Sequence, residues 1–159
     1  MTHEEYMHHA IEAAKKSAHG GGAPIGAIII HDTTGEVVAT GESLVAKHHD
    51  PSAHAELDCI RRACKKLGLL DLTGYTLYST LEPCHMCLSC AAWACLPTMY
   101  FGTYSEDVPL NAYEVRGYDA MQAASLMQLA SGQPMLVRGG ILREECTKLL
   151  QGYHHWVKG

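Results

Sequence analysis

His54 and Glu56 stand two residues apart, and Cys84 and Cys87 follow later with a Cys-x₂-Cys spacing. Imidazole nitrogen and thiolate sulfur are preferred zinc ligands, and this spacing places two sulfurs on one side of a helical turn. Three such ligands would leave the fourth tetrahedral position to water, which is the arrangement of a catalytic zinc site. The sequence therefore predicts a zinc centre made by His54, Cys84 and Cys87.

Glu56 lies close enough to His54 to serve as the acid and base of this site. The metal would lower the pKa of a water molecule toward about 7. Glu56 would take the proton and pass it to a ring nitrogen and then to departing ammonia. Residues i and i+2 of a regular helix point about 200° apart, so both must lie at the mouth of a helix. The predicted reaction is hydrolytic deamination of an amidine-type carbon.

Other interpretations remain open on spacing alone. A lone Cys-x₂-Cys is more often a structural zinc or redox site than a catalytic one. A structural site would need a fourth ligand, and Cys90 is the nearest candidate, but it lies about 9 Å beyond Cys84 along a helix axis. The redox interpretation leaves His54 and Glu56 without a role. A non-catalytic zinc-binding protein stays as an alternative.

Helices and strands alternate along the chain that carries these residues. Asp50 is the expected N-cap of the second helix, with Pro51 at its first position. Residues 103–117 show no clear helical or strand pattern. The order predicts a three-layer α/β/α domain with a mixed sheet of about five strands. The expected helices cover residues 7–19, 50–67, 83–95, 119–130 and 141–150, and the expected strands cover 25–30, 36–40, 75–80, 98–101 and 135–137.

The composition suits one globular domain over residues 1–159. Hydrophobic residues make up 47% and charged residues 18%, which supplies one packed core and argues against a disordered chain. The formal net charge of −5 does not favour a broad basic surface for nucleic acid and favours a small-molecule partner. The N-terminus lacks the apolar core of a signal peptide, no apolar run could cross a membrane, and we expect a reducing cytoplasm.

In combination, the motifs resemble those of the cytidine deaminase-like superfamily. H-x-E followed by P-C-x-x-C is the pattern of zinc nucleobase deaminases, and it runs here from His54 to Cys87 with Pro83 in place. Residues 24–27, 50–56 and 77–87 look most like the short bacterial branch of guanine, cytosine and tRNA-adenosine deaminases, and guanine deaminase most of all. The resemblance implies the sheet order 2-1-3-4-5, one Zn²⁺ per chain and usually a homodimer.

The resemblance also implies which residues contact the substrate. Trp93 is similar to an aromatic residue of guanine deaminases, although core packing is an equal alternative. Asp107 or Glu114 could supply acidic groups that those enzymes carry after the fourth strand. Trp156 is similar to a tail aromatic that covers the base, with a dimer contact as the alternative. Ala55 and Pro83 belong to the matched stretches and complete the expected contacts.

One departure from the family concerns the loop after the second strand. The branch normally has an Asn there that binds the base, whereas residues 41–45 contain none and Ser43 is the nearest replacement. A hydroxyl has less donor and acceptor capacity than an amide. The resemblance implies a small nitrogen heterocycle as substrate, guanine-type first and cytosine next, and the missing Asn adds another aminopurine, pterin or triazine to the candidates. A tRNA-adenosine substrate is the alternative, and the acidic loop 104–109 disfavours it because RNA phosphates would be repelled.

Overall fold

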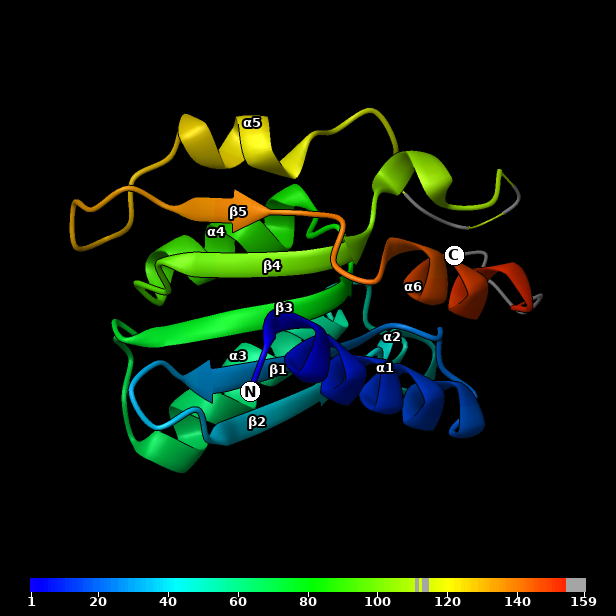
Figure 1. The fold of residues 1–159 in the computed structure, drawn as a ribbon, viewed down its shortest axis with the longest axis horizontal. Helices are drawn as coiled ribbons and strands as arrows, with labels where there is room; N and C mark the ends of the chain where they lie inside the picture. The colour runs from blue at the N-terminus through cyan, green and yellow to red at the C-terminus, as the bar shows by residue number, and fades with distance from the viewer. Residues whose placement is uncertain (111, 113–114, 154–159) are drawn as a thin grey trace.

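The computed structural model describes residues 1–110, 112 and 115–153, which form a sheet between two layers of helices (Figure 1). The strands lie in the order β2-β1-β3-β4-β5. β1 is antiparallel to β2 and β3, and β3, β4 and β5 run parallel. The predicted mixed sheet and its strand order are confirmed. The elements are α1 (His3–His19), β1 (Gly26–His31), β2 (Val37–Glu42), α2 (Val45–His48), α3 (Ala55–Leu67), β3 (Tyr75–Leu81), α4 (His85–Trp93), β4 (Thr98–Thr103), η1 (Ser105–Asp107), α5 (Ala120–Ser125), β5 (Leu136–Arg138) and α6 (Arg143–Gln151).

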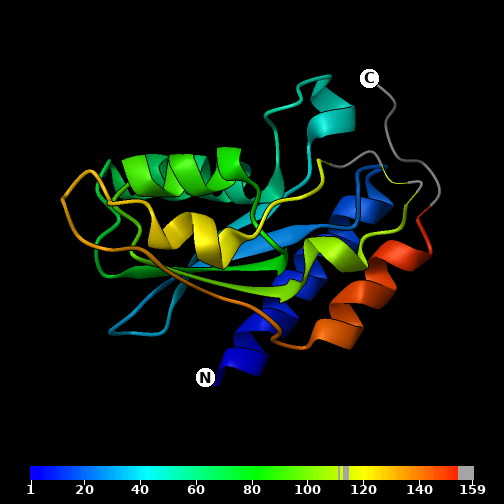
Figure 2. The same ribbon diagram turned by 90° about the horizontal axis from the view of Figure 1, so that it is seen from above.

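Both faces of the sheet are covered by helices (Figure 2). Ala27 and Ile29 of β1 belong to the core beneath α3, α4 and α5, whereas Ile28 and Ile30 belong to the core beneath α1 and α6. This alternation follows from the two-residue period of a strand, and it requires β1 to be apolar on both sides. In the described part of the chain, no helix has the length and apolar character needed to span a membrane.

The helix that carries Glu56 begins later than the sequence predicted. Asp50 does not cap it, because the Asp50 carboxylate instead accepts hydrogen bonds from the backbone N–H and the hydroxyl of Ser52. These bonds form a local turn of a kind that Asp side chains favour. The N-cap of α3 is therefore His54, so the turn brings a metal-ligand candidate to the position directly before the first helical residue.

Three other elements also differ from the sequence-based expectation. α5 ends at Ser125 rather than near residue 130, because the chain turns back there and Leu129 donates a backbone hydrogen bond to Gln133. The short helices α2 and η1 were not predicted, since each has only three or four residues and no apolar period of its own. Both lie in loops at the end of the sheet where β2 and β4 finish.

Candidate metal and catalytic site

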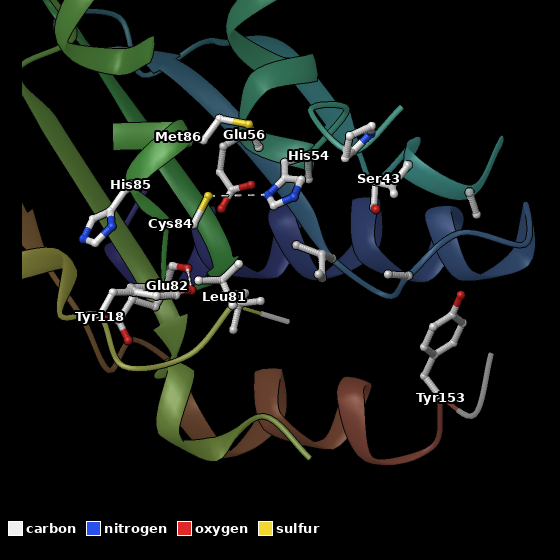
Figure 3. Close-up of a pocket in the computed structure, with 17 residues that line it drawn as sticks. Ser43, His54, Glu56, Leu81, Glu82, Cys84, His85, Met86, Tyr118 and Tyr153 are labelled. Carbon is white, nitrogen blue, oxygen red and sulfur yellow. Dashed lines mark hydrogen bonds between the residues drawn. The ribbon is translucent and has the colours of Figure 1, made fainter. Parts of the chain in front are cut away.

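Two helix N-termini meet at one place beside the sheet (Figure 3). His54 is the N-cap of α3 and Cys84 is the N-cap of α4, and both have extended backbone angles. Neither side chain caps its own helix. Both therefore extend into the space between the two helices, and Cys87 joins them from the first turn of α4.

The three side chains have the spacing that a tetrahedral zinc ion requires. The sulfurs of Cys84 and Cys87 are 3.6 Å apart, and each lies 3.7 Å from Nδ1 of His54. Zinc–sulfur bonds of about 2.3 Å and zinc–nitrogen bonds of about 2.05 Å at tetrahedral angles give separations of about 3.8 Å and about 3.6 Å. Among the described residues, these three alone form a compact group of metal-ligating atoms, and Cys90 does not join it.

The electrostatics of the site favour a thiolate at Cys84. Cys84 is hydrogen-bonded to Cys87 and lies beside His54, and these contacts lower its pKa to about 4. The contact with Cys84 and burial raise the pKa of Cys87. These opposite shifts favour ionisation of Cys84 before Cys87. A divalent cation would displace the second proton, since both cysteines bind metal as thiolates.

Glu56 is the second residue of α3 and is 3% exposed. Its position in the first turn, at the mouth of the helix, satisfies the geometric condition that the i, i+2 spacing imposes. Burial raises the pKa of the carboxyl group to about 7, and one of its oxygens accepts a hydrogen bond from the Ser79 hydroxyl. A carboxyl group with a pKa near neutrality can both accept and release protons in the physiological range.

A cavity of about 500 Å³ opens over the candidate metal ligands. Its walls are mainly apolar, with the Glu56 carboxylate and the Ser43 side chain among the few polar groups (Figure 3). Enclosed pockets of this size and character commonly bind small organic molecules. The lining residues are Ala23, Ile25, Ser43, Val45, Ala46, Pro51, His54, Ala55, Glu56, Leu81, Glu82, Cys84, His85, Met86, Val115, Tyr118 and Tyr153.

The structure brings some of the predicted substrate contacts to this cavity. Ser43 and Ala55 line it together with His54, Glu56 and Cys84. Pro83 is buried and does not line it, although both of its chain neighbours do. Glu114 and Trp156, two further predicted contacts, lie outside the described residues.

Trp93 and Asp107 lie away from the cavity in this chain. Trp93 is 79% exposed and borders a separate shallow depression with Met127. It is the last residue of α4, about 14 Å along the helix axis from Cys84, which explains why it does not reach the site. Asp107 is instead held by Arg143, which donates two hydrogen bonds of 2.8 Å to its carboxylate.

Several residues of the site were not singled out from the sequence. Glu82 lies directly before Pro83, and its buried carboxylate accepts backbone hydrogen bonds from Ser105 and Ala120. Tyr118 donates a hydrogen bond to the Glu82 carbonyl and lines the cavity. These contacts join segments more than twenty residues apart, so no local pattern could have revealed them.

The chain is similar to known deaminases in sequence. The profile of the cytidine and deoxycytidylate deaminase zinc-binding region matches residues 1–103. Guanine deaminase from Bacillus subtilis is 38% identical over 108 residues, which are 67% of this chain and 68% of that protein. The tRNA-specific adenosine deaminase of the same organism is 35% identical over 155 residues, which are 96% of this chain and 89% of that protein.

The fold is similar as well. The structure of guanine deaminase from Nitrosomonas europaea superposes with a TM-score of 0.81 at 23% identity, over 94% of this chain and 83% of that chain. At this identity the likeness concerns the fold, including the predicted cytidine deaminase-like architecture. The family profile also covers the two helix N-termini that carry the ligand candidates. Sequence and fold together establish that this chain belongs to the cytidine and deoxycytidylate deaminase family and is a zinc-dependent hydrolytic deaminase.

Proposed function

We propose that this protein binds one zinc ion per chain and deaminates a small nitrogen heterocycle, with a guanine-type base as the first candidate. The cavity carries this proposal. Its apolar walls, formed by residues such as Ile25, Val45 and Leu81, suit the faces of a planar ring. Its polar groups suit the edge of such a ring, and Glu56 lies where the reacting carbon would approach the metal ligands.

In this proposal Glu56 moves the protons. A zinc ion held by His54, Cys84 and Cys87 supplies a water molecule of lowered pKa when it is bound. Ser79 donates a hydrogen bond to one carboxylate oxygen of Glu56, Oε1, and in this proposal the other oxygen accepts the proton. The same oxygen then delivers protons to a ring nitrogen and to the leaving amino group, so that ammonia departs.

Ser43 is the proposed contact for the polar edge of the substrate. It is 7% exposed and lines the cavity from the loop after β2, where the resemblance led us to expect an Asn. A hydroxyl can make fewer simultaneous hydrogen bonds than an amide. The set of heterocycles accepted by this protein should therefore differ from that of an enzyme with an amide at this position.

A tRNA adenosine is the second candidate substrate. The tRNA-specific adenosine deaminase relative matches nearly the full chain, whereas the guanine deaminase relative matches 108 residues. Exposed Lys47, His48 and His49 lie next to the cavity residues Val45 and Ala46. The net charge of −5 disfavours a tRNA substrate, because RNA is itself negatively charged. The acidic loop is a weaker objection than the sequence indicated, because Arg143 pairs with Glu106 and Asp107.

Ammonia release by the zinc-loaded protein tests the proposal directly. The panel contains guanine, cytosine, adenine, their nucleosides, and aminopterin-type and aminotriazine compounds, with an anticodon stem-loop assayed in parallel for inosine. Turnover of a free heterocycle is the expected result. Inosine in the stem-loop without turnover of any small compound would favour the tRNA candidate. No turnover in either assay, with zinc bound, would support a non-catalytic zinc-binding protein.

Two broader expectations accompany this function. We propose a homodimer, on the ground of the family resemblance, which size-exclusion chromatography with light scattering can test. We also propose a cytoplasmic location, where the seven cysteines would stay reduced, and fractionation of the source cells can test it.

A further inference from the structure

We propose that Ser79 is a positioning residue that orients the carboxylate of Glu56. The inference rests on the proposed deaminase function. Ser79 lies in β3 and is completely buried, and its Oγ donates a hydrogen bond to Oε1 of Glu56 at 3.1 Å. The bond joins the central sheet to the second residue of α3, so it links a strand that is paired on both sides to the proton-transfer group.

The position of the Ser79 hydroxyl is set by the sheet. β3 has hydrogen-bonded neighbours on both sides, and Ser79 is paired with Ala27 of β1 and Phe101 of β4. The backbone N–H of Leu81 points to the Ser79 oxygen at 3.4 Å. Because that oxygen faces a donor, the hydroxyl hydrogen is left for the carboxylate, which can only accept when it is ionised.

A glutamate side chain has three rotatable bonds, so burial alone does not choose the direction of its carboxylate. The contact with Ser79 engages Oε1 and so orients the carboxylate, whose other oxygen is the one that we assign to proton transfer. A buried hydroxyl is costly unless it is hydrogen-bonded, and Glu56 is the side-chain partner that the structure shows for this one. Misplacement of a reacting group by a small distance can reduce a rate considerably.

The neighbouring residue provides a matched control. Thr80 is also buried in β3 and its hydroxyl is also hydrogen-bonded, but its partner is the backbone N–H of Gly26 rather than Glu56. Ser79→Ala and Thr80→Val therefore each remove one buried hydroxyl from the same strand. The first removes a contact of Glu56, and the second does not.

Steady-state kinetics on the best substrate of the panel test the inference. We expect Ser79→Ala to lower kcat about tenfold, as the loss of one hydrogen bond to a charged group would, with KM changed by less than about twofold. Thr80→Val should retain the wild-type kcat. Zinc content should equal that of the wild type in both variants, and Ser79→Thr, which keeps the hydroxyl, should recover most of the kcat of Ser79→Ala.

A second measurement does not depend on turnover. A crystal structure of metal-free Ser79→Ala should show the Glu56 carboxylate rotated or in more than one position, while that of Thr80→Val should match the wild type. Equal kcat losses in Ser79→Ala and Thr80→Val, or an unmoved carboxylate, would overturn the inference. If the wild type deaminates nothing, the proposed function fails, and the carboxylate position still decides the role of Ser79.

Discussion

Gly41 of β2 lies directly against the backbone of Ala55, the first residue of α3. A Cβ atom at position 41 would overlap the Ala55 carbonyl oxygen and come within 2.6 Å of the Cys59 nitrogen. The absence of a side chain therefore allows the helix to rest on the sheet backbone. Because His54 and Glu56 flank Ala55, this contact also affects the position of the proposed catalytic carboxylate and of one ligand candidate.

Gly41→Ala should disturb both the fold and the site. The added methyl group meets backbone atoms, which cannot rotate away, so we expect the free energy of unfolding to fall by about 1–3 kcal/mol or more. Zinc affinity should fall as well, since α3 must shift. Gly152→Ala is the control, because a Cβ there meets nothing within 4 Å. Chemical denaturation and zinc titration measure the two effects, and equal results for both variants would contradict the prediction.

Cys84→Ala and Cys90→Ala should distinguish a zinc ligand at the start of α4 from a cysteine of the same helix that does not bind the metal. Cys84 belongs to the compact group of ligand atoms and Cys90 does not. We expect Cys84→Ala to lose zinc and activity together, and to melt at a lower temperature than the zinc-loaded wild type, because bound metal contributes to stability. Cys90→Ala should keep a full zinc content by elemental analysis. Loss of zinc from Cys90→Ala would mean that the site is a closed structural one.

Glu56→Gln should abolish turnover and leave zinc in place. Glutamine has nearly the same size as glutamate but cannot accept and deliver protons in this range. We expect kcat to fall by at least about 100-fold, as for the loss of a general acid–base group, with unchanged zinc content. Glu12→Gln, on the exposed side of α1, is the control. Retention of activity by Glu56→Gln would remove Glu56 from the mechanism.

The burial of Glu56 also predicts a pH-dependent stability of the metal-free protein. Its pKa is raised from 4.5 to about 7 in the folded state. Between these values the unfolded chain is ionised while the folded chain keeps the proton, so the stability associated with this group is full below about pH 4.5 and falls as the pH rises toward 7. The loss is at most about 3.5 kcal/mol, from about 1.4 kcal/mol per pKa unit.

The metal-free Glu56→Gln variant should lack this decrease of stability with rising pH. Urea denaturation at pH 5, 6, 7 and 8 should show a stability difference in favour of the variant that grows with pH and levels off above about pH 7. Taking the difference removes the contributions of other titrating groups that the two proteins share. A constant difference across this range would show that the carboxyl group is not desolvated in the folded protein.

Glu82→Gln should loosen the cavity wall that contains Tyr118. Both carboxylate oxygens of Glu82 accept backbone N–H groups, at 2.7 Å from Ser105 and 2.8 Å from Ala120. A glutamine must turn its own NH₂ group toward one of these donors, which should cost about 1–3 kcal/mol. We expect faster hydrogen exchange at the backbone amides of Ser105 and Ala120, and a higher KM. Glu144→Gln, in the exposed first turn of α6, should change neither.

The sequence alone carried the metal-ligand candidates, the candidate proton-transfer residue and the order of the elements. His54, Cys84 and Cys87 could be proposed as ligands, and Glu56 as the acid and base, because these residue types at these short spacings form a recognisable pattern. The strands and most helices could be predicted because their apolar periods are local. The start of α3 could not, because Asp50 forms a turn with Ser52 instead of a cap.

The tertiary structure decided which residues surround the reacting groups. Ser79, Glu82 and Tyr118 reach the site through contacts with residues far away in the chain, and Trp93 points elsewhere because α4 carries it away from the ligands. Such contacts depend on how helices pack on the sheet, as at Gly41, where one missing side chain sets the approach of α3. Packing distances of this kind arise between elements, so no spacing within a single segment encodes them.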